Sequence, residues 1–323
     1  MVMAKKHKYG NSNLHAAKNN KNDEFYTRLC EIENEVQNYW QYLKGKTIYC
    51  PCDNPYHSNF VKYFIDNFHN IGIARLIATC YSPPKDLFNE APYNPVTATA
   101  YKLDVTSPED WESSIVELSG NGDFASDECL TLLRQADVVV TNPPFSLFRK
   151  FFQCLVDNSV DYLLLGNLMA LSYKGIVPHV VSGNVNVGYF ARGKCGNMYY
   201  SLPEHYECRA NDSWEDEDGQ KWIKLRTCLW LTSLPVHKQM PELPLTQSYC
   251  PERYPHYDNY DAINVDRVVD IPKDYHGAMG MPITYMLKHS PEQFEILDFV
   301  ARPTIGSRGV FDRFIIRRRS TVR

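Results

Sequence analysis

The chain has 323 residues, of which 44% are hydrophobic, and its formal net charge at pH 7 is -4. A chain of this length and composition can form a sizeable hydrophobic core, in one large domain or two ordinary ones. It should therefore fold without disulfide bonds. The slightly acidic balance excludes a protein that coats nucleic acid indiscriminately. Basic side chains nevertheless cluster at both ends of the sequence, where they are available for phosphate contacts.

The cysteine pattern and the hydropathy pattern both predict a cytoplasmic protein. No apolar segment that could serve as a secretory signal follows the first eight residues, so a reducing compartment is expected. The 10 cysteines include no C-x-x-C pair, so zinc-ligand spacing is absent and no metal is predicted. The longest apolar stretch, 162–171, is interrupted by Gly166 and Asn167 and falls well short of the ~20 residues of a membrane span.

The first two thirds of the sequence alternate between strand and helix patterns. Residues 1–22, rich in Lys and Asn, predict a flexible basic arm. Apolar residues then recur at spacings of three and four over 23–43, which predicts an amphipathic helix ended by Gly45. Strands are predicted at 47–50, 75–80, 138–141 and 162–166, and helices at 59–68, 127–136 and 147–156. This alternation predicts an α/β fold with a mostly parallel sheet and crossover helices.

Beyond about residue 200 the sequence changes to prolines, tyrosines and charges without a clean period. Short strands are expected at 228–232 and 314–316, and long surface loops over the Tyr- and Asp-rich stretch 249–275. The change in composition predicts three parts, namely the arm at 1–22, a main domain at 23–200 and a second region at 201–323.

The most informative segment is Asn142-Pro143-Pro144-Phe145, directly after an apolar strand. Asn142 offers a side-chain carbonyl as acceptor, and Pro143 has no N–H, so its backbone presents only a carbonyl. Pro144 stiffens the turn and Phe145 supplies a flat aromatic face. These groups are suited to gripping an exocyclic NH2 and stacking on its ring. The alternative interpretation is a proline-rich turn that closes a buried strand.

With this tetrapeptide at the end of a strand in an α/β sheet, the chain resembles the EcoRI-type family of DNA adenine-N6 methyltransferases, which use S-adenosylmethionine. The segments that carry the resemblance lie between about residue 20 and the end of the chain: 21–27, 49–55, 122–124, 135–137, 142–149, 203–206 and 257–266. Several methyltransferase families share Asn-Pro-Pro-Phe, whereas the first and last of these segments are more particular to this family.

The resemblance implies a Rossmann-like, doubly wound fold with an S-adenosylmethionine-binding catalytic domain at 23–200 and a DNA target-recognition region at 201–323. It implies site-specific methyl transfer to a flipped-out adenine in duplex DNA, as the modification part of a restriction–modification system. A cognate restriction endonuclease that shares the site, without binding stably, is a further implied partner, whose existence the sequence does not decide.

The same resemblance implies the site residues. The catalytic set is Asn142, Pro143, Pro144 and Phe145. The cofactor set is Asp23, Phe25, Tyr26, Thr27, Cys50, Asp53, Asp123, Phe124 and Asn142. In this set Asp53 contacts the methionine or ribose portion, Asp123 reads the adenine amino group, and Phe124 stacks on that ring. A helix cap or a turn carboxylate is the alternative role of Asp123.

Two departures from the broader fold accompany these assignments. The usual glycine-rich turn after the first strand is replaced by Pro51-Cys52-Asp53-Asn54-Pro55, and the second strand ends at Thr79-Cys80-Tyr81 without a carboxylate for the ribose hydroxyls. Three other functions stay open: cytosine-N4 methylation, methylation of RNA or of a protein glutamine, and a DNA-binding relic that has lost its cofactor.

Overall fold

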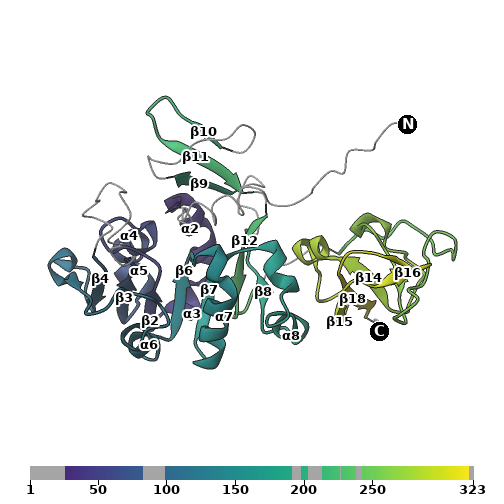
Figure 1. Ribbon diagram of the computed structural model, residues 1–323, viewed down its shortest axis with the longest axis horizontal. Coiled ribbons are helices and arrows are strands. Elements are labelled where there is room, and N and C mark those ends of the chain that lie inside the picture. Colours follow the sequence, from purple (N-terminus) through teal and green to yellow (C-terminus); the bar gives the residue numbers. More distant parts are fainter. Residues whose placement is uncertain are drawn as a thin grey trace, which may run out of the picture.

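The computed structural model describes residues 26–82, 99–190, 198–202, 213–225, 227–237 and 242–319, and within these residues its largest element is an eight-stranded sheet in the order β5-β4-β3-β2-β6-β7-β12-β8 (Figure 1). The strands are β2 (Thr47–Cys50), β3 (Arg75–Thr79), β4 (Tyr101–Val105), β5 (Val116–Glu117), β6 (Val138–Thr141), β7 (Asp161–Asn167), β8 (Asn186–Val187) and β12 (Cys228–Thr232). The central strands β3, β2, β6 and β7 run parallel, and antiparallel strands flank them on both sides. The predicted α/β class with a sheet that is parallel at its centre is confirmed.

The central position of β6 follows from its composition. All four of its residues are buried, as expected for a strand covered on both faces, and three of them are valines. Val138 and Val140 enter one hydrophobic cluster, whereas Val139 enters the other, because successive side chains point to opposite faces of the sheet. The sheet therefore has a core on each side.

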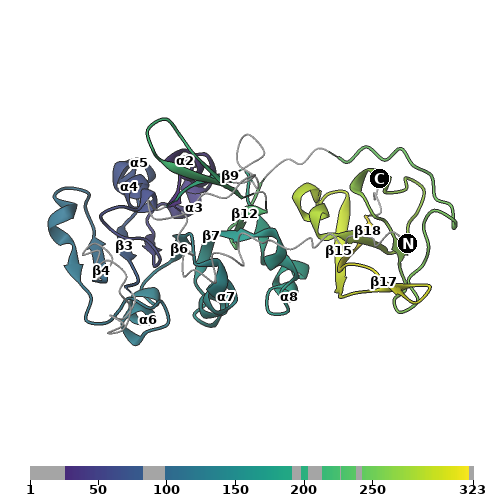
Figure 2. The same cartoon turned by 45° about the horizontal axis from the view of Figure 1, so that its top comes forward.

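Helices cover both faces of this sheet. They are α2 (Leu29–Val36), α3 (Trp40–Leu43), α4 (Asn59–Asp66), α5 (Phe68–Ile71), α6 (Asp127–Leu133), α7 (Phe148–Asp157) and α8 (Val177–Val181), with 3-10 turns η1 (Gln37–Tyr39), η2 (Trp111–Ser114), η3 (Phe145–Leu147) and η4 (Leu168–Ser172). Figure 2 shows α2 to α5 on one side of the sheet and α6 to α8 on the other. The first group packs into the Val138 cluster, and α6 and α7 pack into the Val139 cluster.

The first helix is shorter than its pattern predicts. It begins at Leu29 instead of residue 23, because residues 26 and 27 form β1 (Tyr26–Thr27), which pairs antiparallel with β9 (Met198–Leu202). A 3-10 turn interrupts it at Gln37–Tyr39. Its predicted end is confirmed, since Gly45 follows with a φ of 71°, a left-handed conformation that glycine adopts without strain.

The chain returns to the central sheet after the predicted boundary at residue 200. β9 joins β11 (Lys221–Leu225) and β10 (Ser213–Glu215) in a small antiparallel sheet with β1, which lies above the main sheet in Figure 1. β12 then pairs with β7, with Trp230 opposite Leu165. All five residues of β12 are buried, so burial of its apolar side chains stabilises its position in the central sheet.

The last part of the chain forms a separate unit beside α8 (Figure 1). Its sheet has the order β13-β14-β18-β15, built from β13 (Ile263–Asn264), β14 (Met279–Pro282), β18 (Arg313–Arg318) and β15 (Phe294–Val300). Its remaining elements are η5 (Val268–Asp270), η6 (Ile283–Lys288), β16 (Thr304–Ile305) and β17 (Arg308–Gly309). The Val139 cluster continues into this unit through Met279 and Phe314, and α8 contacts β15.

The stretch 249–275 is largely irregular, as predicted, but it is not only a surface loop. Tyr254, Ile263, Val265 and Ile271 are at most 2% exposed because they pack into the cluster that contains β14 and β18. No helix in the described part of the chain has the length and apolar character that crossing a membrane requires.

Candidate active site

A buried carboxylate joins the carboxyl ends of three parallel strands. Asp53 lies in the turn after β2, and its side chain is 6% exposed. Thr141, the last residue of β6, donates its hydroxyl to Asp53 Oδ2 at 2.5 Å. The Asp53 N–H donates to the carbonyl of Thr79, the last residue of β3, at 2.9 Å. Asp53 therefore marks the edge of the sheet at which open α/β folds bind their ligands.

The surroundings of Asp53 raise its pKa to about 6. Burial is the main cause because it disfavours the charged form, and the hydrogen bonds from Thr141 and Ser58 act in the opposite direction. The Ser58 hydroxyl donates to Asp53 Oδ1 at 2.7 Å. Ser58 also caps α4, where its side chain accepts the Phe60 N–H at 3.0 Å. Each carboxylate oxygen thus receives one hydroxyl.

The Thr141 hydrogen bond also places the Asn-Pro-Pro-Phe segment next to the Asp53 turn. Asn142 directly follows Thr141 and is half-buried, Pro143 is buried, and Pro144 and Phe145 are half-buried. Pro144 is extended, with φ -56° and ψ 125°, and Phe145 begins η3, which leads into α7. The ring of Phe145 packs against the Val138 cluster. The structure therefore brings all four predicted catalytic residues to the edge where Asp53 lies.

The segment before the first helix reaches the same edge. The Thr27 carbonyl accepts the Asn59 side-chain N–H at 2.8 Å, and Asn59 follows Ser58 at the start of α4. Thr27 is 4% exposed, and its hydroxyl oxygen is buried with no hydrogen-bond partner within the part of the chain that the structure describes. Asp23 and Phe25 lie outside the described residues, as does the side chain of Tyr26.

The predicted cofactor residue Cys50 has a fully buried side chain at the end of β2. Burial raises the pKa of its thiol well above the usual value, so the sulfur stays protonated and inert. A cofactor contact at this position would come from the backbone, and the side chain belongs to the core.

Asp123 and Phe124 lie beside the end of β3. Gly122 has a φ of 72°, and a Cβ at this position would overlap the Cys80 carbonyl oxygen, so only glycine allows this approach. Asp123 Oδ1 accepts the Ala125 N–H at 2.9 Å, so this carboxylate does close a turn. The cap of α6 is Ser126, whose hydroxyl accepts the Cys129 N–H, so the alternative role of Asp123 as the helix cap is wrong.

The ring of Phe124 is more buried than we expect for a ring that stacks on a cofactor. It is 7% exposed, meets Phe151 edge-to-face with the centroids 5.0 Å apart, and has the Lys150 ammonium 5.3 Å from its centroid. Stacking of Phe124 on the cofactor stays a prediction.

Comparison with known proteins decides the family. The family model described as "Adenine-specific methyltransferase EcoRI" matches residues 13–320. The chain belongs to this family. The type II methyltransferase M.EcoRI of Escherichia coli is 42% identical over 294 residues, which cover 90% of this chain and 89% of the relative.

Two relatives from mycoplasmas support the same family. The type II methyltransferase M.MgeORF184P of Mycoplasma genitalium is 34% identical over 291 residues, covering 89% of this chain and 86% of the relative. M.MpnI of Mycoplasma pneumoniae, also a type II methyltransferase, is 34% identical over 291 residues, which cover 89% of this chain and 85% of the relative. No solved structure matches the chain significantly.

Two residues that bond Asp53 at this edge, Ser58 and Thr141, are not among the site residues predicted from the sequence. A serine directly before a helical pattern is a signal for a cap, and a threonine that ends an apolar strand signals a polar group at the sheet edge. Neither signal reveals the shared partner Asp53. Within the described residues, no group of three or more His, Cys, Asp or Glu side chains is arranged to hold a metal ion.

Replacing Ser58 with alanine is expected to have two effects. Loss of the cap should lower the free energy of unfolding by about 1 kcal/mol. Loss of the hydroxyl at Asp53 Oδ1 should raise the pKa of Asp53 above its wild-type value, because that hydrogen bond favours the ionised form. Denaturant unfolding and carboxyl-carbon NMR measure the two effects. Ser58→Thr, which keeps the hydroxyl, is the control, and an unchanged Asp53 pKa in Ser58→Ala would contradict the assignment.

Proposed function

We propose that this chain is a site-specific DNA methyltransferase that moves a methyl group from S-adenosylmethionine to the N6 atom of an adenine flipped out of duplex DNA. In this proposal it is the modification enzyme of a restriction–modification system. The observation that carries the proposal is the hydrogen bond from Thr141 to Asp53 in a chain of this family. This bond joins the Asn142–Phe145 segment to the edge of the sheet at which open α/β folds bind their ligands.

The residues at this edge fit S-adenosylmethionine. The Thr27 hydroxyl oxygen is buried without a partner among the described residues, and such a group normally finds a hydrogen bond. The Asp53 carboxylate would accept from the ammonium or ribose hydroxyls, and Asp123 from the adenine amino group. When bound, the cofactor supplies an activated methyl group on a sulfonium. The turn after β2 would approach it without glycine, since Pro51 and Pro55 shape that turn.

The Asn142 side-chain oxygen and the Pro143 carbonyl oxygen would accept the two N6 hydrogens of adenine. The lone pair of this amine is delocalised into the ring, so the amine is a poor nucleophile in its planar form. The two acceptors favour a pyramidal nitrogen and stabilise the positive charge that it develops in the transition state. Stacking of the base on Phe145 would hold its nitrogen in line with the methyl group, and such orientation contributes about 7 kcal/mol or more in well-aligned sites.

A base inside a duplex cannot reach this edge, so we infer that the adenine is flipped out, at an unpairing cost of roughly a few kcal/mol. Contacts from the second half of the chain would offset this cost. We place the Rossmann-like catalytic domain in the first 200 residues together with β12, which pairs with β7, and DNA target recognition in the remainder of 201–323.

The test is methylation of mixed-sequence duplex DNA by the purified protein with isotope-labelled cofactor, followed by digestion to nucleosides and mass spectrometry. The expected product is N6-methyladenine, and mapping of the labelled positions gives the recognition sequence. N4-methylcytosine, or label in RNA or peptide but not in duplex DNA, would contradict the proposal. If the protein transfers no methyl group and calorimetric titration with the cofactor gives no heat, the chain would be a DNA-binding protein that has lost its cofactor.

A further inference from the structure

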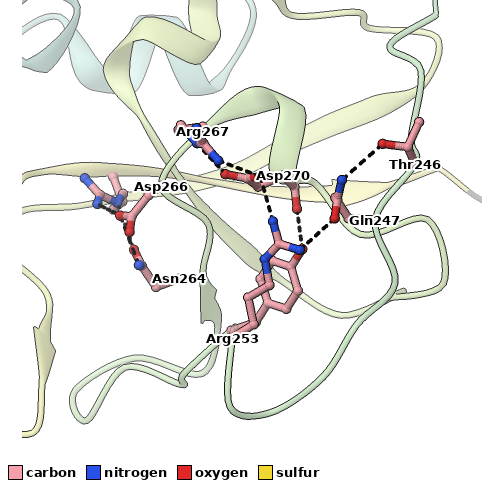
Figure 3. A network of polar contacts seen from close by, with 9 residues as sticks. Thr246, Gln247, Arg253, Asn264, Asp266, Arg267 and Asp270 are labelled. Atoms are coloured by element: carbon pink, nitrogen blue, oxygen red, sulfur yellow. Dashed lines mark hydrogen bonds and ion pairs between the residues drawn. The ribbon is translucent and has the colours of Figure 1, made fainter.

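A single carboxylate in the C-terminal unit holds two exposed arginines. Arg267 donates from Nε and Nη2 to the two oxygens of Asp270, at 2.6 Å and 3.1 Å. Arg253 donates from Nη2 to Asp270 Oδ1 at 2.9 Å and from Nη1 to the side-chain oxygen of Gln247 at 2.6 Å. Figure 3 shows both guanidinium groups converging on Asp270. One negative charge therefore orients two positive charges.

The arginines keep donors available for a ligand. Asp270 is 13% exposed, whereas the side chains of Arg253 and Arg267 are 44% and 70% exposed. A guanidinium has five N–H donors, and each arginine uses only two of its donor nitrogens in the bonds above. The guanidinium of Arg253 also lies 5.5 Å from the ring centroid of the buried Tyr254, which restricts its motion.

Two further cationic residues are joined to this network through the backbone of Lys273. The Lys273 N–H donates to the Gln247 carbonyl at 2.9 Å, and Arg318 Nη1 donates to the Lys273 carbonyl at 2.7 Å. The chain of contacts Arg267–Asp270–Arg253–Gln247–Lys273–Arg318 thus carries four cations and one carboxylate. The further carboxylates next to these residues in the sequence are Glu252, Asp266 and Asp274. Asp266 pairs with the buried Arg313 at 2.9 Å, and Asp274 accepts the Tyr249 N–H at 2.7 Å. With Arg313 counted beside its partner Asp266, these residues comprise five cations and four carboxylates, in a protein whose net charge is -4.

Stability alone does not account for such an arrangement. Exposed ion pairs contribute only about 0–1 kcal/mol, because solvent screens them. A bidentate fork such as that between Arg267 and Asp270 instead fixes the direction in which the remaining N–H groups point. Pre-orientation of this kind lowers the entropy that is lost on binding an anion, and the planar guanidinium matches the geometry of phosphate.

We propose that Arg253, Arg267, Lys273 and Arg318 form a phosphate-contact surface for the backbone of the duplex, with Asp270 as the residue that positions the two arginines. This inference rests on the proposed function and adds the surface by which the C-terminal unit holds DNA. The contacts are sequence-independent, because they reach phosphates and not base edges.

The test compares Arg253→Gln and Arg267→Gln with the wild-type full-length protein, using a fluorescent mixed-sequence duplex over a series of salt concentrations. Each variant is expected to weaken DNA binding by about 3- to 10-fold and to lower the slope of log Kd against log salt by about one. Thermal unfolding of each variant checks that the fold is intact.

Arg317 offers a matched control on the same strand. It lies next to Arg318 on β18 and therefore points to the opposite face, where Glu295 pairs with it at 2.8 Å. Arg317→Gln removes the same charge but should change DNA affinity less than about 2-fold and leave the salt slope unaltered. Wild-type affinity and slope in the double variant of Arg253 and Arg267, with a wild-type protein that methylates DNA, would overturn this inference alone. Wild-type protein that neither binds nor methylates DNA would overturn the proposed function as well.

Discussion

Asn142→Ala is expected to lower kcat for methyl transfer by about 100- to 1000-fold, the range found when one group that stabilises transition-state charge is removed. In the proposed mechanism alanine leaves Pro143 as the sole acceptor for the amine, so the second hydrogen of the amine would lose its partner as positive charge develops. Because the loss arises mainly in the transition state, KM for DNA should change much less than kcat. Single-turnover methylation with labelled cofactor measures the chemical step directly.

Asn142→Asp is the informative companion to this variant. Aspartate keeps the shape of asparagine and an acceptor oxygen, so it should retain more activity than alanine. Thermal unfolding confirms that each variant folds, which matters because Asn142 is half-buried beside the fully buried Thr141. Calorimetric titration with the cofactor separates a loss of binding from a loss of chemistry. Near-normal turnover by a folded Asn142→Ala protein would remove Asn142 from the catalytic set.

The elements predicted most accurately are those with a purely local signal. β2, β6 and β12 have the predicted bounds, because short apolar runs rich in β-branched or aromatic residues are strands in nearly any buried context. The Asn142–Phe145 segment was found for the same reason, since its four residues are contiguous. The turn that contains Asp53 follows from its position after a strand.

Features that depend on distant partners were not predictable in this way. The first helix begins late because Thr27 pairs with Tyr200 across the chain, and the boundary near residue 200 does not separate β12 from the central sheet because β12 pairs with β7. Likewise, the bond between Asp53 and Thr141 joins positions 88 residues apart. No hydrophobic period within a short window carries information about such pairings.

Asp53→Asn is expected to change how stability depends on pH. The folded-state pKa of Asp53 is about 6 and its reference value is 3.8, because burial favours the protonated form. Between these values the folded protein keeps a proton that the unfolded chain has lost, so wild-type stability falls as pH rises from about 4 to 6 and levels off above. At 1.36 kcal/mol per pKa unit the loss amounts to about 3 kcal/mol. An asparagine side chain has no such proton, so Asp53→Asn should gain this amount relative to wild type across the same window.

Urea unfolding of both proteins at intervals from pH 4 to 8 measures this difference, and groups that titrate identically in the two proteins cancel. Two parallel stability curves over the whole range would show that Asp53 does not titrate there. Cofactor affinity gives an independent measurement on the same pair. Ionised Asp53 is the better acceptor for an ammonium or hydroxyl group, so wild-type affinity should rise as pH increases through about 6, whereas Asp53→Asn should bind more weakly and lose this rise. The buried carboxylate would then reduce stability at neutral pH in exchange for ligand binding, which is the behaviour expected of a group held by Thr141 and Ser58 for a functional purpose.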